Sequence, residues 1–192
     1  MESKCLRLVL PFKFNQQTRM TPSDKTLQQQ FEDCVERCAD SLYRVAYRLT
    51  SNATLARELV QETYLNAWRN LESLEDPQKL RGWMFAILRN QYSRLIRKES
   101  KTARAYEHLE TIAIETTGPE QPNEKIDAVQ AAINELDEKH KLPILLVSME
   151  GMSVEEAAEI LKLPKGTVLS RLHRGRQKIK AALIRDGIKQ KQ

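Results

Sequence analysis

Residues 166–180 combine many basic side chains with groups that can hydrogen-bond to nucleic-acid bases. On a helical wheel, Ser170 and Arg174 point away from the apolar stripe, and His173 lies at the margin of the same outward face. Hydroxyl, imidazole and guanidinium groups can contact base edges in the major groove of DNA. The pattern therefore predicts a helix that recognises duplex DNA.

The flanks of this helix carry cations that suit phosphate groups. No acidic residue occurs from 160 to 185, whereas a helix that is merely solvated usually mixes acids among its bases. Val168 and Leu172 belong to a narrow core-facing stripe, and Gly175 beside it would permit a close approach of another helix. The candidate DNA contacts of this helix are Lys165, Thr167, Ser170, Arg171, His173, Arg174, Arg176 and Lys178.

The segment before this helix predicts a helix-turn-helix. Ser153, with Glu156 three residues later, is a capping box that begins a helix ending at Leu161. Pro164 cannot continue that helix but suits the start of the next one. Turns of this kind often contain Gly, and Lys162 occupies the corresponding place here.

A second cationic helix is expected at residues 79–100. One broad arc of it is apolar, and the remaining face carries Trp83, Asn90, Arg94 and Arg97. Aromatic and cationic side chains on one face are typical of proteins that bind single-stranded or melted DNA. The alternative is that Trp83 packs against the preceding loop, and the sequence leaves both possibilities open.

The helix expected at residues 53–73 has an acidic outward face. Glu58, Gln61, Glu62 and Leu65 share this face. Acids around one exposed Leu suggest a surface that docks a basic helix of another protein. Exposed acids are also common on helices that bind nothing.

Composition predicts an all-α chain, because long runs of Val, Ile and Thr are absent from its 192 residues. Residues 105–127 hold six acids and one Lys between two basic blocks. Two small helical domains joined by a flexible acidic linker are therefore expected, the second being the helix-turn-helix. The predicted units are a mobile tail at 1–22, a first domain at 23–100, the linker at 101–122 and a second domain at 123–192. Helical periodicity is expected at 24–50, 53–73, 79–100 and 123–149, with Pro143 in the first turn of a helix that runs to Met149.

The three cysteines, Cys5, Cys34 and Cys38, suggest a reducing cytoplasm, because the chain is long enough to fold without disulfides. Cys34 and Cys38 are one helical turn apart, and we expect core or surface thiols there, with a metal or redox role as the alternative. No segment is long and apolar enough to predict insertion into a membrane. Nothing in the sequence indicates a nucleophile–base pair, a phosphate-binding loop, a metal site or a cofactor, so we expect a protein that is not an enzyme.

Three segments in this order resemble the extracytoplasmic-function (ECF) sigma factors, a two-domain class of bacterial transcription initiation factors. They are ARELVQETYLNAWRNLESL, LRGWMFAILRNQYSRLIRK and GMSVEEAAEILKLPKGTVLSRLHRGRQKIKAAL. The resemblance covers roughly residues 31–100 and 125–185. It implies a subunit of RNA polymerase that selects promoters, acts in the cytoplasm and is held by an anti-sigma protein.

The resemblance also assigns roles to the three faces. The first domain would bind the clamp of core RNA polymerase through Glu58, Gln61, Glu62 and Leu65. Melting and recognition of the −10 promoter element would fall to Asn70, Arg81, Trp83, Asn90, Arg94 and Arg97. The recognition helix would enter the −35 element, with Ser170, His173 and Arg174 nearest the bases. Members of the family commonly have Lys or Arg where this chain has Leu169, which leaves the −35 sequence preference open.

The expected function is promoter-specific transcription initiation as a sigma factor. A helix-turn-helix repressor or activator that binds duplex DNA without polymerase is the alternative.

Overall fold

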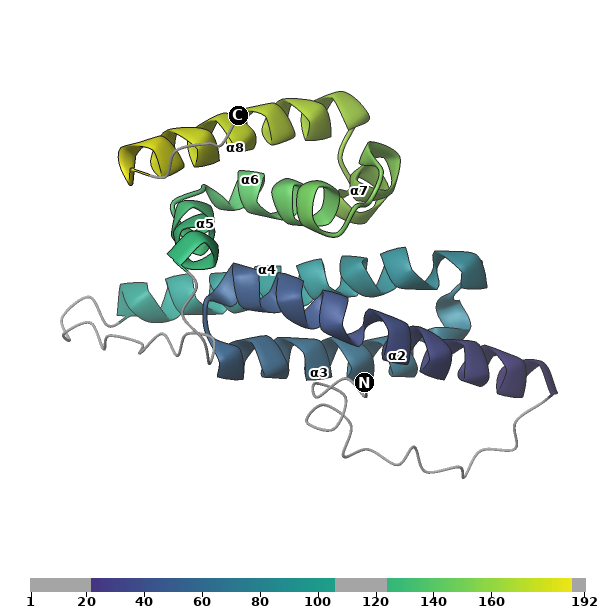
Figure 1. Ribbon diagram of the computed structural model, residues 1–192. Helices are drawn as coiled ribbons and strands as arrows, with labels where there is room; N and C mark the ends of the chain where they lie inside the picture. The colour runs from purple at the N-terminus through teal and green to yellow at the C-terminus, as the bar shows by residue number, and fades with distance from the viewer. Residues whose placement is uncertain (1–21, 106–123, 188–192) are drawn as a thin grey trace.

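A computed structural model describes residues 22–105 and 124–187, and every regular element within these residues is helical. The all-α prediction is therefore confirmed. The described helices form two groups, an N-terminal domain and a C-terminal domain that lies against one side of it (Figure 1). None of these helices is both long and apolar enough to cross a membrane. Most of the expected tail at 1–22 and linker at 101–122 lies outside the described residues.

The N-terminal domain consists of three long helices and two short 3₁₀ turns. Its elements are α2 (Pro22–Thr50), α3 (Ala53–Arg69), η1 (Leu71–Ser73), η2 (Pro77–Lys79) and α4 (Leu80–Ala105). The side-chain oxygen of Asn52 accepts hydrogen bonds from the backbone N–H groups of Thr54 and Leu55, which fixes the start of α3. The expected helix at 53–73 ends at Arg69, and η1 follows it.

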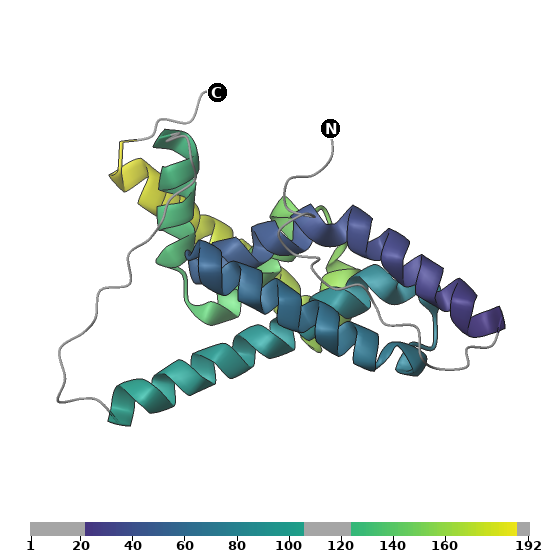
Figure 2. The same cartoon turned by 90° about the horizontal axis from the view of Figure 1, so that it is seen from below.

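The core of this domain lies between α2, α3 and α4. Phe31, Leu42, Met84 and Leu88 are completely buried in it. The rings of Phe31 and Trp68 are 5.6 Å apart, so the aromatic pair closes one end of the α2–α3 contact. The C-terminal part of α4, by contrast, extends away from the other helices of the domain (Figure 2).

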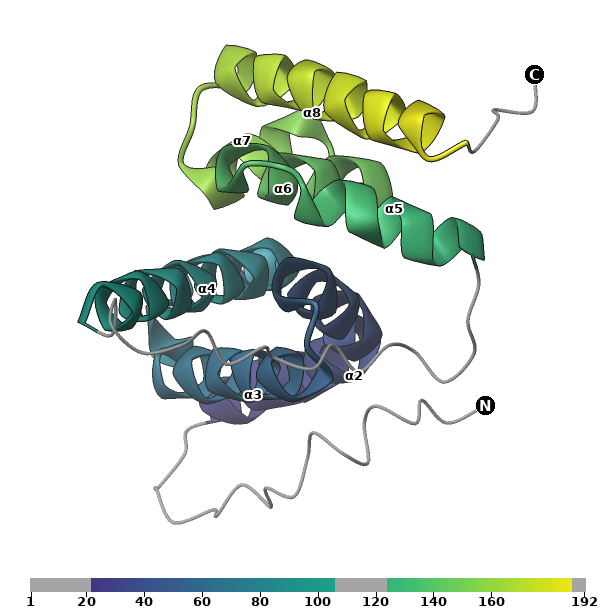
Figure 3. The same ribbon diagram turned by 90° about the vertical axis from the view of Figure 1, so that its left-hand side faces the viewer.

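The C-terminal domain is built from shorter helices covered by one long one. Its elements are α5 (Glu124–Asn134), α6 (Glu138–Pro143), η3 (Ile144–Met149), α7 (Val154–Leu161) and α8 (Lys165–Arg185). Figure 3 shows α8 on the side of this domain that faces away from α2, α3 and α4. The position of α8 leaves one of its faces open along its whole length.

The expected position of Pro143 was wrong. Instead of opening a helix that runs to Met149, Pro143 ends α6, which begins at Glu138, and a π-helical turn follows it. Pro has no backbone N–H and its ring crowds the preceding turn, so a regular α-helix is difficult to continue through it. The wider π turn keeps Ile144, Leu145 and Leu146 buried.

The helix-turn-helix prediction agrees with the structure. Ser153 Oγ accepts from the backbone N–H of Glu156 at 3.1 Å, and the backbone N–H of Ser153 donates to the Glu156 carboxylate at 2.8 Å. This capping box begins α7. Lys162 ends α7 in the left-handed backbone conformation, with φ of +54°. Gly is the residue most often found in this conformation at the end of a helix.

Gly175 permits the close approach that the sequence suggested. A Cβ atom at this position would lie 2.9 Å from Ile144 Cγ1 and 3.5 Å from His140 Cβ. No side chain fits between α8 and the α6–η3 segment at that point. Gly175 thus sets how close α8 lies to its own domain.

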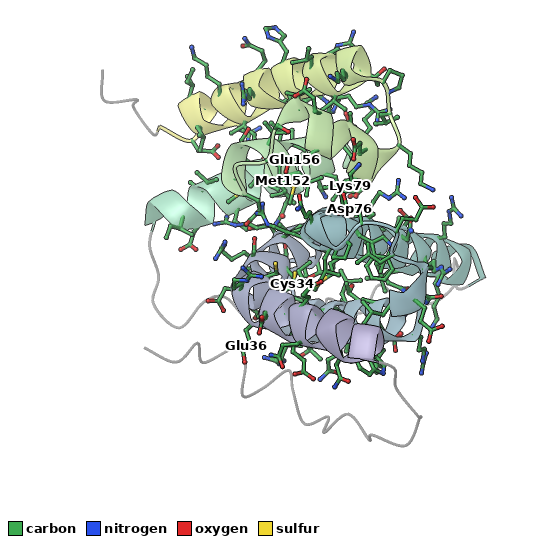
Figure 4. The ribbon with its side chains drawn as sticks, turned by 90° about the vertical axis from the view of Figure 1, so that its right-hand side faces the viewer. Cys34, Glu36, Asp76, Lys79, Met152 and Glu156 are labelled. Carbon is green, nitrogen blue, oxygen red and sulfur yellow. The ribbon has the colours of Figure 1, made fainter. Side chains whose placement is uncertain are left out.

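The two domains pack directly on each other, and one hydrophobic cluster runs through both. Ile160 of α7 lies 4.0 Å from the place of a Cβ on Gly82 of α4. Met152 belongs to the same buried cluster, and Lys79, the last residue of η2, lies near it (Figure 4). A flexible linker between two helical domains, as the sequence predicts, does not by itself indicate this contact.

Candidate nucleic-acid and polymerase interfaces

The outward face of α8 is free of core contacts. Ser170, His173 and Arg174 are all exposed on it. Ser170 Oγ donates to the backbone carbonyl of Thr167 at 2.9 Å, so its lone pairs remain open to a donor from outside. These side chains lie together on one face, as the sequence predicted, and a major groove can take a helix of this width.

Several cations on the flanks of α8 pair with the protein's own polar groups. Lys165 Nζ lies 2.9 Å from the Glu155 carboxylate, and Lys178 Nζ lies 2.6 Å from that of Asp137. The hydrogen bond from Lys178 holds the pKa of the Asp137 carboxyl below its ordinary value. Exposed pairs of this kind contribute little to stability, because water and salt screen the charges. A phosphate group can therefore replace the carboxylate as the partner of either lysine.

The remaining predicted residues of α8 differ in exposure. Arg176 is exposed and donates to Ser148 Oγ at 3.1 Å, whereas Thr167 and Arg171 are half-buried. Leu169, the residue that departs from the family pattern, is 55% exposed among these polar groups. An exposed Leu can offer only an apolar contact, such as one to a thymine methyl group.

A polar face of α4 stands clear of the helical core. Asn90, Arg94 and Arg97 are exposed on it, at spacings of three and four residues. Trp83 is half-buried and packs against the core. Part of its side chain therefore has a packing role, which was the alternative to DNA binding. The exposed remainder lies on the same side of the helix as the cations.

Arg81 and Asn70, also expected at this surface, have other neighbours. Arg81 Nη2 donates to the backbone carbonyl of Glu150 at 3.2 Å, and its guanidinium lies 5.7 Å from the ring centre of Phe85. Arg81 therefore faces the domain contact and not the side of α4 that carries Trp83. Asn70 follows the end of α3, where its side chain donates to the Asn66 carbonyl at 2.8 Å.

The acidic surface of α3 lies opposite the buried side of that helix. Glu58 and Glu62 are exposed, and Gln61 and Leu65 on the same face are half-buried. Glu62 accepts from the side chain of Asn66 at 3.4 Å, within the same helix. The four predicted residues share one face that the rest of the described chain leaves open.

A polar contact that no sequence pattern indicates joins the two domains. The Glu150 side chain is only 4% exposed and accepts from Arg44 of α2 at 3.1 Å. The hydroxyl of Ser41 also donates to this carboxylate. A Glu next to Gly151 in a loop looks like an ordinary solvated residue in the sequence, and only the docking of the domains makes it buried.

Known protein families match both domains of the chain. The family described as Sigma-70 region 2 matches residues 34–102, and Sigma-70 region 4 matches residues 126–179. The ECF RNA polymerase sigma factor EcfG of Rhodopseudomonas palustris is 32% identical over 147 residues, which cover 77% of this chain and 81% of that protein. This chain belongs to the ECF family of RNA polymerase sigma factors. It carries the two regions, 2 and 4, of a promoter-directing sigma factor.

Further relatives of this ECF sigma factor come from other bacteria. SigE of Mycolicibacterium smegmatis is 30% identical over 167 residues, covering 84% of this chain but only 65% of that protein. SigW of Bacillus subtilis is 28% identical over 168 residues, covering 81% of this chain and 90% of that protein.

Two solved protein complexes contain chains that share the fold. The sigma factor RpoE of Bartonella quintana, solved with the anti-sigma factor NepR, matches 83% of this chain and 97% of that chain. The match has a TM-score of 0.70 and 26% identity. CnrH, solved with the cytosolic domain of CnrY, matches 83% of this chain and 90% of that chain with a TM-score of 0.63 and 28% identity.

Proposed function

We propose that the three open surfaces divide the work of promoter-specific initiation. The acidic face of α3 binds core RNA polymerase, the polar face of α4 binds the −10 element, and the outward face of α8 binds the −35 element. The outward face of α8 is the observation that supports this best. It is exposed, carries cations on its flanks and belongs to the second helix of the helix-turn-helix.

The proposed chemistry is binding and not catalysis. Exposed cations on α4 and α8 attract the phosphate backbone, and hydrogen-bonding groups between them select the bases. The half-exposed Trp83 offers a stacking surface for a base that leaves the duplex, which offsets part of the cost of unstacking. Both steps take place in the cytoplasm, on the DNA template of the polymerase.

The polymerase contact is tested by reversing charge on α3. We expect Glu58→Lys and Glu62→Lys each to weaken binding to core polymerase in a pull-down, because a basic partner helix would meet a cation. Glu36→Lys is the matched control, since Glu36 is an exposed acid that points outwards from α2 (Figure 4). Normal binding and initiation by both α3 variants would refute the proposed contact.

The promoter function is tested by permanganate footprinting of core polymerase with this protein. We expect thymines around the −10 element to become reactive only when the protein is present. Duplex binding with no open bubble on any promoter would instead support a repressor or activator that acts without polymerase.

We also propose that a second protein holds this sigma factor inactive. The support is that RpoE was solved with an anti-sigma factor and that CnrH was solved with CnrY. Purification of the tagged chain from its native host should recover such a partner in place of core polymerase before induction.

A further inference from the structure

Three sulfur atoms meet between α2 and α4. Cys34 Sγ lies 3.4 Å from Cys38 Sγ and 3.7 Å from Met84 Sδ. Cys34 is 6% exposed, Cys38 is 5% exposed and Met84 is fully buried. Figure 4 shows Cys34 directed into the interior, away from the exposed side of α2 that carries Glu36. None of the three promoter-initiation surfaces uses these groups.

The spacing of these atoms fits a shared metal ion better than a disulfide. Three metal–sulfur bonds of about 2.3 Å at the angles of about 120° of a three-coordinate ion place the sulfur atoms about 4.0 Å apart. The two separations that involve Cys34, 3.4 Å and 3.7 Å, are about 0.6 Å and 0.3 Å shorter than that value. A disulfide needs Cβ atoms about 3.5–4.5 Å apart, whereas residues four apart on a helix have Cβ atoms about 5–6 Å apart. Cys34 and Cys38 could therefore form a disulfide only if α2 were distorted.

Each thiol must lose its proton to bind a metal ion, because the thiolate and not the thiol is the ligand.

We propose that Cys34, Cys38 and Met84 form a binding site for one Cu(I) ion. Two thiols and one thioether are soft ligands, and soft sulfur ligands select Cu(I) over harder cations. Zn²⁺ normally requires four ligands, and the described residues contain no group of three or more His, Cys, Asp or Glu side chains placed to hold a metal.

Binding is a proton exchange without a redox step. The two thiols together lose two protons, the Cu(I) ion forms bonds to two thiolates and one thioether, and no electron is transferred. The resulting complex carries one negative charge, which the guanidinium groups of Arg37 and Arg81 offset.

The proposal is tested by anaerobic titration of the full, reduced chain against bicinchoninate, a chelator that competes for Cu(I). A Cys5→Ser background removes the thiol that lies outside the described residues. We expect one Cu(I) per chain to be withdrawn from the chelate, and X-ray absorption at the copper edge to show only sulfur neighbours. Retention of the copper by the chelator, or nitrogen or oxygen neighbours, would overturn the proposal.

Two variants separate the site from adventitious binding. Met84→Leu keeps the size and apolar character of the side chain but removes one proposed ligand. We expect it to lower the Cu(I) affinity by at least about 10-fold, because even the loss of a partner outside the ligand shell costs about 10–100-fold. Met152→Leu is the matched control, because Met152 is a buried thioether outside the cluster, and its affinity should equal that of the parent. Equal affinity of the Met84→Leu and parent proteins would exclude the three-sulfur site, and circular dichroism checks that each variant is folded.

Discussion

The guanidinium of Arg44 donates to the carboxylate of Glu150 at 3.1 Å across the boundary between the two domains. Ser41 donates to the same carboxylate, and Arg81 donates to the backbone carbonyl of the same residue. Three side chains of the N-terminal domain therefore converge on one residue of the loop before α7. A buried carboxylate needs such partners, because its desolvation is costly without them.

Replacing Glu150 by Ala should weaken the docking of the domains. The variant loses the hydrogen bonds from Arg44 and Ser41. A hydrogen bond to a charged group contributes about 1.5–3 kcal/mol, and the bond from Arg44 contributes less than this because water screens its exposed guanidinium. Small-angle X-ray scattering of the free protein should show a larger radius of gyration. Glu159→Ala is the control, since its pair with Lys79 at 3.5 Å is exposed on both sides and should contribute little. Unchanged dimensions of Glu150→Ala would show that apolar packing alone holds the domains together.

Arg174 should contribute to sequence selection at the −35 element. Arg174→Ala is expected to reduce discrimination between cognate and altered −35 sequences by about 1–3 kcal/mol, the contribution of a bidentate base contact. Lys180→Ala provides the comparison, because Lys180 is an exposed cation of α8, and the loss of a phosphate contact weakens binding to all sequences equally. Competition binding on duplexes that differ at single positions measures both effects. If Arg174→Ala weakens binding to all −35 sequences equally, Arg174 contacts a phosphate and not a base.

Gly175→Ala should destabilise the C-terminal domain, although Ala favours helices. The added Cβ would lie 2.9 Å from Ile144 Cγ1 and 3.2 Å from its Cδ1, so α8 would have to move outwards. Overpacking of this kind costs about 1–3 kcal/mol. Thermal denaturation of Gly175→Ala, Ile144→Ala and the double variant forms the test. The double variant should be more stable than the sum of the single losses predicts, and strict additivity would contradict the contact.

Lys162→Gly should raise stability, because Lys162 has φ of +54° at the end of α7. Gly adopts this conformation without the penalty of about 1 kcal/mol that a side chain brings. The same replacement at Lys180, inside α8, should lower stability by about 1 kcal/mol. Urea denaturation distinguishes the two, and a loss of stability in Lys162→Gly would mean that the lysine side chain makes a compensating contact.

Local patterns in the sequence predicted the elements well where they have strong local causes. The capping box of Ser153 and Glu156 fixes the start of α7 because both hydrogen bonds form within four residues. The outward face of α8 follows from the apolar stripe that includes Val168 and Leu172. Pro143 was placed wrongly, because helical periodicity alone does not show where an α-helix widens into a π turn.

The contact between the domains could not be predicted in the same way. Glu150 and Arg44 are 106 residues apart in the chain, and nothing local pairs them. Arg81 illustrates the effect on the candidate sites. Its charge and place in a basic helix suggest a DNA contact, but the docked domain directs its guanidinium to the Glu150 carbonyl. The role of Arg81 at the −10 element stays a prediction.

The position of Arg81 links domain docking to promoter affinity. If its guanidinium binds DNA during initiation, one donor cannot satisfy both the Glu150 carbonyl and a phosphate in the same geometry. Promoter DNA then binds only the state in which the domains are undocked. The apparent dissociation constant for the promoter is therefore inversely proportional to the fraction of molecules in that state. Any substitution that loosens the Glu150 contact would, by the same linkage, make the protein bind promoters more tightly without touching a single base.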